Sequence, residues 1–358
     1  MSPKIDKLNC LLLLVSCILA WVTPFGLLVL AYAILGPLHY WTEIFWLEDR
    51  QCFLPKRRDS RWLIALALVG TALGITTVVL ARSPSPWMSG WAFHTQQAAI
   101  TVVLLAITIP LVFWKYSDWK HRVLAALGIA ILGASFYYLY DAFGYYTLFA
   151  VWLPTVVHVY VFTGMFMLSG ALKSRSLWGA MSFGLLIVCG VALLIVELPF
   201  TLQIDSVFAS RYMETLGHIH EAMLNMLSGI VSQTYGNNSL TLSDLGIRVS
   251  RFLAFSYTYH YLNWFSKTSI IGWHHCQSKK LLKILMLWAF CGLLYAIDYS
   301  LALTVVGILS LLHVFYELPL NWRSLHSILA HWNLWNRNEA KKFIQRTSVP
   351  SVSLVQAD

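Results

Sequence analysis

Charged residues are scarce in this chain. Only 11% of its 358 residues are Asp, Glu, Lys or Arg, whereas soluble globular proteins carry about 25%. Hydrophobic residues make up 58%. This composition cannot build a water-exposed surface, so it excludes a soluble globular protein. It predicts an all-α, polytopic transmembrane helical bundle whose surroundings are the lipid bilayer.

The usual catalytic signatures are also missing. The sequence has no HExxH, GxSxG, Walker A or GxGxxG motif, and none of the HxxHH pairs of membrane fatty-acid desaturases. The net charge of +9 comes from basic residues scattered through short loops, without a basic stripe interleaved with aromatics. We therefore expect no nucleic-acid partner.

Cysteine provides no disulfide framework. Four of the six cysteines fall in predicted spans, and Cys52 and Cys276 fall in segments predicted to be cytoplasmic, where thiols stay reduced. Residues 14–17 superficially resemble a lipoprotein cleavage box, but the chain stays apolar to Leu35. We interpret this region as an uncleaved first span.

Apolar runs predict about nine membrane spans. The seventh is the least certain by composition because Ser256, Thr258, His260 and Asn263 interrupt it. Trp residues near many span ends are typical of an aromatic belt at the membrane interface. The predicted spans are 10–36, 62–81, 97–114, 123–140, 145–170, 178–200, 250–266, 281–299 and 300–318.

Loop charges predict the orientation. Most Lys and Arg residues lie in loops on one side, which is predicted to be cytoplasmic by the positive-inside rule. This pattern predicts an outside N-terminus, a cytoplasmic C-terminus and residence in the plasma or inner membrane. The side predicted to be outside carries only Lys4, Lys7, Arg82, Arg211 and Arg248, with Arg251 at a span edge.

We divide the chain into a transmembrane helical domain, 1–320, and a basic cytoplasmic tail, 321–358. The longest loop, 201–249, lies on the predicted outer face. Within it, residues 207–232 carry apolar side chains at helical spacing, which predicts an amphipathic helix on or partly within the membrane surface.

Two motifs with the same spacing carry the most chemical information. His39 and Glu43 are four residues apart near the cytoplasmic end of the first predicted span, and His313 and Glu317 repeat this spacing in the last. Residues four apart share a helix face, so each pair presents an imidazole and a carboxylate in one direction. In either pair the Glu could be a ligand, a catalytic group or the residue that orients a ligating His.

Two further histidines, His158 and His260, lie in the fifth and seventh predicted spans. An ionisable side chain within a bilayer costs about 3 kcal/mol, so its presence there suggests function. Together with His39 and His313 they form a predicted metal site for iron or zinc near the cytoplasmic face. His274 and His275, just beyond the seventh span, are secondary candidates.

Each of these residues also has a plain structural interpretation. A lone His in a membrane helix commonly hydrogen-bonds a neighbouring helix. An HxxxE pair arises easily by chance, and His274 and His275 beside Lys279 and Lys280 suit a headgroup-facing segment. The case for a metal rests on the predicted convergence of several such residues.

A second polar group lies on the predicted outer surface. Glu214, His218 and Glu221 share a helix face, which is the solvated face of the amphipathic segment. Metal binding there is a secondary hypothesis.

Three functions follow from these patterns. The first is a metal-dependent membrane enzyme, an oxidoreductase or hydrolase, that acts on a lipid or other hydrophobic small molecule near the cytoplasmic face. The second is a transporter or membrane assembly protein with structural or proton-relay histidines, for which Asp141, Glu197 and Asp298 are the acidic candidates. The third is a haem protein with bis-histidine ligation between two of His158, His260 and His313. Protein partners cannot be derived from the sequence.

Overall fold

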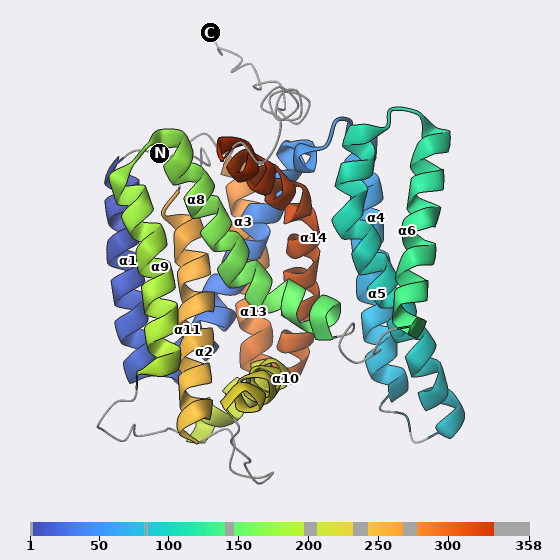
Figure 1. Ribbon diagram of the computed structural model, residues 1–358. Helices are drawn as coiled ribbons and strands as arrows, with labels where there is room; N and C mark the ends of the chain where they lie inside the picture. Colours follow the sequence, from blue (N-terminus) through green and yellow to red (C-terminus); the bar gives the residue numbers. More distant parts are fainter. Residues whose placement is uncertain are drawn as a thin grey trace. The chain divides into compact units, whose positions relative to one another are not determined.

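The computed structural model describes residues 3–81, 83, 85–139, 147–196, 206–231, 243–267 and 278–332, and every regular element in these ranges is a helix (Figure 1). Eight helical segments are long and apolar enough to cross a membrane. Such a set is typical of a multi-pass membrane protein. The eight segments are Lys4–Val22, Pro24–Asp49, Arg58–Thr77, Pro86–Lys115, Trp152–Ser174, Leu177–Ile195, Ser278–Ile297 and Tyr299–His331.

The first predicted span is divided differently from the expectation. The sequence analysis joined 10–36 into one crossing, whereas α1 (Pro3–Val22) ends before Thr23 and a new helix begins at Pro24. Proline has no N–H to continue a helix but suits the first position of the next one. The second segment consists of α2 (Pro24–Leu30), the π-helix η1 (Ala31–Leu35) and α3 (Gly36–Asp49). Two separate apolar helical segments therefore replace the single predicted span.

Where their residues are described, the other predicted spans coincide with helices. The last helix continues through Pro319 to His331, so the first residues of the segment assigned to the tail are helical. Residues from 333 onward lie outside the described part. The helices are α4 (Arg57–Ala81), α5 (Pro86–Lys115), α6 (Trp119–Leu139), the π-helix η3 (Thr147–Phe162) with α8 (Thr163–Ser174), α9 (Leu177–Ile195), α11 (Asp244–Phe265), α13 (Ser278–Ile297) and α14 (Tyr299–His331).

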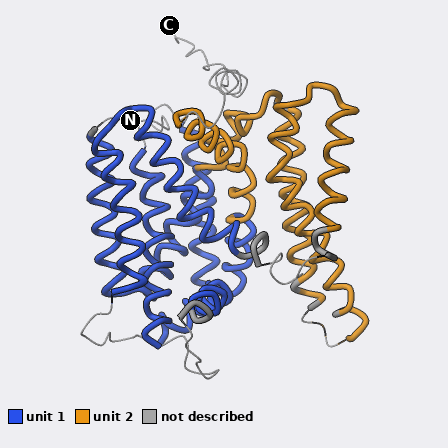
Figure 2. Tube along the Cα trace, viewed as in Figure 1, with its two compact units in different colours: residues 1–42, 152–309 blue, residues 43–151, 310–358 orange. Residues whose placement is uncertain are grey.

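The chain forms two compact units (Figure 2). Unit 1 comprises 1–42 and 152–309, and unit 2 comprises 43–151 and 310–358. In unit 1, α11 packs against α1, α2, η1, α9 and α10 (Ser206–Val231). Most side chains of α11 are buried as a result. This helix is therefore the centre of unit 1.

The position of α11 explains its polar sequence. A helix surrounded by other helices can satisfy polar side chains internally, which a lipid-facing helix cannot do. Ser243 caps its first turn by accepting from Gly246 N at 3.1 Å, Ser256 Oγ donates to Phe252 O at 2.7 Å, and Tyr259 OH donates to Asn9 Oδ1 at 3.1 Å. The polar residues that weakened the prediction of this span are therefore buried within unit 1: Ser256, Thr258, His260 and Asn263.

Unit 2 contains a helical hairpin and a third helix. α4 packs against α5, and α5 packs against α6. Arg122, in the first turn of α6, donates to both carboxylate oxygens of Asp59 in α4, at 2.8 and 3.4 Å. The side chain of Asp59 is 2% exposed, so this ion pair ties the N-terminal ends of α4 and α6 together.

The predicted amphipathic helix is confirmed as α10 (Ser206–Val231). Its apolar face is buried through Leu216, Ile219, Met223 and Leu224. It packs against α2 and α11, and it is not among the eight apolar segments.

Candidate metal centre

His39 lies in the first turn of α3, directly after the π-helical turn η1, and its side chain is 1% exposed. π-Helical turns widen a helix locally and are frequent at functional sites. Gly36 leaves room for two aromatic side chains, because a Cβ there would lie 3.2 Å from the hydroxyl of Tyr40 and 3.4 Å from that of Tyr261. The small residue lets these two aromatic side chains approach beside His39.

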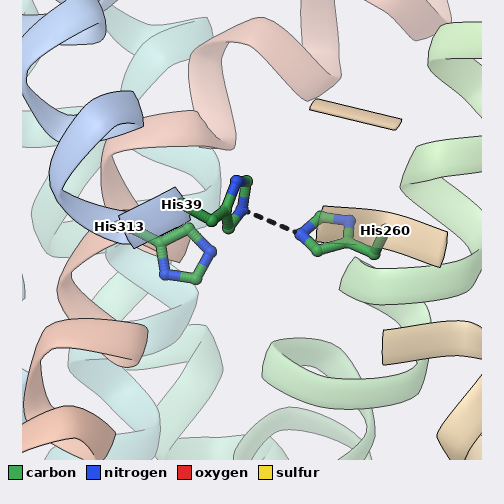
Figure 3. Close-up of side chains that lie close together, drawn as sticks. All are labelled: His39, His260 and His313. Carbon is green, nitrogen blue, oxygen red and sulfur yellow. Dashed lines mark hydrogen bonds between the residues drawn. The ribbon is translucent and has the colours of Figure 1, made fainter. Parts of the chain in front are cut away.

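His260, in α11, contacts His39 directly. Their Nε2 atoms lie 3.1 Å apart (Figure 3). On the other side of the ring, Nδ1 of His260 lies 2.8 Å from Thr163 Oγ1, the first residue of α8. With Nδ1–H donating to Thr163, the Nε2 lone pair of His260 faces His39. A hydroxyl or carbonyl partner that fixes a ring in this way is the usual support of a metal-ligating histidine.

His158 completes a group of three buried histidines within unit 1. It lies in η3, four residues after Pro154, and is 1% exposed. Its ring centroid is 4.9 Å from that of His260, and the centroid of His39 is 4.7 Å from the same ring on α11. His260 therefore packs against both other imidazoles, so His39 and His260, two of the residues predicted to converge, lie in contact with His158 beside them.

The spacing of the two Nε2 atoms suits a shared ion. Nitrogens that bind one metal at about 2.0–2.1 Å lie roughly 2.9–3.4 Å apart when the angle at the metal is roughly 90–109°. The observed separation of 3.1 Å falls within that range. The two Nε2 atoms share a hydrogen bond, and an ion that replaced its proton would be bound by both lone pairs. Neutral imidazoles are good ligands for iron and zinc, so His39 and His260 could contribute two ligands to a metal ion.

Both carboxylates of the two motifs, together with His313, belong to unit 2. Glu43 begins the part of α3 that belongs to unit 2, and His313 and Glu317 lie in the part of α14 after Leu309. All three side chains are buried, with exposures of 2%, 1% and 2%. Buried charged groups need compensation by partners. His313 and Glu317 are further candidates for metal ligation.

Tyr and Trp side chains surround His39 in ways that the sequence analysis did not resolve. The hydroxyls of Tyr40 and Tyr261 share a hydrogen bond of 2.7 Å, and Trp264 Nε1 donates to Thr42 Oγ1 at 2.9 Å. Tyr259 faces the other side of α11, toward Asn9. Thr163 was missed altogether, because a hydroxyl in an apolar run carries no signal until its partner is known.

The secondary candidates for metal binding or transport lie in different parts of the chain. Glu214, His218 and Glu221 lie on the exposed side of α10, and Glu214 accepts from Arg211 at 2.9 Å and from Ser300 Oγ at 2.8 Å. Their exposure agrees with the interpretation as a solvated face. His274 and His275 lie outside the described residues, as do Asp141 and Glu197. Asp298 accepts from Leu301 N at 2.9 Å, which is a helix cap.

His220, also in α10, is fully buried and hydrogen-bonded through Nδ1 to the Tyr212 hydroxyl at 2.7 Å. Burial lowers its pKa to about 4, below the ordinary value of about 6.5. The unfolded chain therefore binds the proton more readily than the folded chain does. As a result, the free energy of unfolding is unaffected by His220 above about pH 6.5 and decreases as the pH falls toward 4.

We expect the free energy of unfolding to fall by about 1–2 kcal/mol between pH 7 and pH 5 through this one residue. Denaturant melts of the purified protein at both pH values, with His220→Gln as the comparison, measure it. His220→Gln removes the titrating ring, so the wild type must lose more stability than the variant. Equal losses in both would show that His220 makes no contribution.

Comparisons with known proteins give no family assignment: no family model, curated protein or solved structure matches this chain.

Proposed function

We propose that this chain is a metal-dependent membrane enzyme that acts on a lipid or other hydrophobic substrate. The observation that carries the proposal is the contact between the Nε2 atoms of His39 and His260 at 3.1 Å, with His158 against the same ring. Three imidazoles buried together among apolar helices are costly to maintain without a ligand. A bound iron or zinc ion would act as a Lewis acid or activate water or oxygen.

His313 and Glu317 are proposed to complete the ligand set. α14 is one continuous helix, and His313 follows Leu309 of unit 1 by four residues, so about one helical turn separates them. Glu317 follows on the same helix face one turn later. A carboxylate added to neutral imidazoles favours a divalent cation and reduces the net charge of the buried site. Glu43, one turn after His39, is proposed to act as a proton acceptor or to orient a ligand.

The proposal places the chemistry near the cytoplasmic face. If α1 and α2–α3 each cross the membrane, and α6 and α11 cross as well, the N-terminus moves to the side of the basic loops. Lys4 and Lys7 then join the positive side, which strengthens the charge bias. We propose this orientation in place of the outside N-terminus that the loop charges alone predict.

We expect an epitope tag at either terminus to be protected from protease in sealed right-side-out vesicles and to be cleaved after permeabilisation. The physical reason is the even number of crossings together with the positive-inside rule. A tag inserted after Val231 should be cleaved in intact vesicles and serves as the control. Cleavage of the N-terminal tag in intact vesicles would restore the original orientation.

The haem alternative is not supported by the packing of the rings. Two axial nitrogens on opposite sides of a haem iron are separated by about 4 Å, with the macrocycle between them. Of the candidate haem ligands, His158 and His260 have ring centroids only 4.9 Å apart. A porphyrin does not fit between rings this close.

The test is metal analysis of the full-length protein purified in mild detergent from cells supplied with both iron and zinc. We expect about one ion per chain in the wild type and much less in His39→Ala. His326→Ala, which removes a histidine bonded to its own helix through Trp322 O at 2.8 Å, is the matched control and should retain the ion. Wild-type protein without iron or zinc after this supply would overturn the proposal.

A further inference from the structure

Unit 2 contains an apolar groove that is separate from the histidine cluster. Its volume is about 400 Å³, and it is formed by α4, α5 and α6. Deep in the groove the lining is aliphatic, through Leu66, Leu105, Ile109 and Ala130. Cavities of this size and lining commonly bind hydrophobic ligands.

The groove has one polar end. Lys56 and Arg58 precede or begin α4, and Ser117 lies in the turn between α5 and α6. Basic residues lie in the segment before α4 and beside the turn between α5 and α6, which predicts that this end lies on the cytoplasmic side. Arg122 also lines the groove, but its charge is matched by Asp59 at 2.8 Å. The exposed side chains of Lys56 and Arg58 therefore leave an excess of two positive charges at this end.

The length of the groove corresponds to one leaflet. Leu66, Leu105 and Ala130 each lie about ten residues along their helices from the polar end, which is about 15 Å at 1.5 Å per residue. The hydrocarbon core of a bilayer is about 30 Å thick. Trp62 and Trp119 stand at the polar end with ring centroids 6.4 Å apart, in the position that aromatic side chains take at headgroup level.

We propose that this groove binds one anionic phospholipid of the cytoplasmic leaflet. Its phosphate contacts Lys56 and Arg58, its glycerol region lies beside Trp62 and Trp119, and one acyl chain fills the aliphatic part. The cations select a lipid with net negative charge over a zwitterionic one, because the amine of a zwitterionic headgroup is repelled from the same end. The site is independent of the metal centre.

The experiment measures lipid retention by full-length protein in mild detergent with native mass spectrometry. Phosphatidylglycerol is compared with phosphatidylcholine at matched acyl chains. We expect wild-type protein to retain phosphatidylglycerol in preference, and K56E/R58E to weaken that retention by at least about 25-fold, roughly fivefold for each cation. Lys120→Glu, at an exposed residue in the first turn of α6 that does not line the groove, is the charge control and should change retention less than twofold.

A second variant tests the apolar part without changing charge. Ala126 lines the groove, whereas Leu124 of the same helix is 69% exposed and does not line it. Ala126→Trp should abolish retention of both lipids, and Leu124→Trp should leave it unchanged. Equal retention of the two lipids by the wild type, or full retention by K56E/R58E, would overturn the proposal. Because K56E/R58E changes only exposed side chains, it decides the question even if Ala126→Trp does not fold.

Discussion

Replacing His260 with alanine is expected to lower the affinity of the purified protein for its metal ion by at least about 100-fold. His260 is the ring that contacts both other histidines of the cluster, with His39 Nε2 at 3.1 Å and the centroid of His158 at 4.9 Å. Loss of a partner that only orients a ligand typically costs 10–100-fold, so loss of the ligand itself should cost more. Metal content after dialysis against a graded chelator series measures the effect.

A neighbouring substitution separates metal binding from packing. Thr163→Val has nearly the same volume but removes the hydroxyl that lies 2.8 Å from Nδ1 of His260. We expect it to weaken metal binding by 10–100-fold, less than His260→Ala does. His121→Ala, at an exposed ring paired with Asp118, is the control. If His260→Ala retains a full complement of metal at every chelator concentration, the three histidines are a packing cluster.

Arg122→Met is expected to be the most destabilising single change in unit 2, lowering the free energy of unfolding by about 3–5 kcal/mol. It leaves the Asp59 carboxylate, 2% exposed, without its guanidinium partner. It also removes donors to the carbonyls of Tyr116 at 2.7 Å and Phe113 at 3.2 Å. Chemical denaturation or thermal melting of the detergent-purified protein measures the loss.

Neutralising the other partner of this ion pair should lower the free energy of unfolding by less. In Asp59→Asn the guanidinium, 13% exposed, keeps its two carbonyl acceptors, so we expect a loss below that of Arg122→Met. In the double variant D59N/R122M no buried charge remains, and stability should recover in part relative to Arg122→Met alone. A double variant as unstable as the sum of the two single variants would show that the pair does not interact.

The histidine cluster was predictable only in part. His39 and His260 are 221 residues apart in the chain, and the argument for bringing them together used orientation and depth alone. That argument suggested a common face because an ionisable ring in an apolar span needs a partner. It could not identify Thr163 or the π-helical turn η1 before His39, because both depend on how neighbouring helices pack.

For the first predicted span, the hydropathy pattern gave a wrong prediction. Residues 10–36 are continuously apolar, so averaging over them predicts one long span. The break at Thr23–Pro24 is visible in the sequence as a proline, but a proline inside an apolar run either kinks a membrane helix or separates two helices. The contacts of α2 with α10 and α11 indicate that packing against other helices selected the second outcome.

By itself the sequence determined the helical class, the apolar segments, the amphipathic nature of α10 and the residue types able to bind a metal, because hydrophobic periodicity and the cost of burying charge are local properties of the chain. Tertiary structure alone decided that α11 is enclosed by other helices, that the Nε2 atoms of His39 and His260 meet at 3.1 Å with Thr163 behind them, and that α4, α5 and α6 leave a groove between them. These features depend on which helix faces meet, and in a chain with apolar residues on nearly every face, hydrophobicity does not distinguish one face from another.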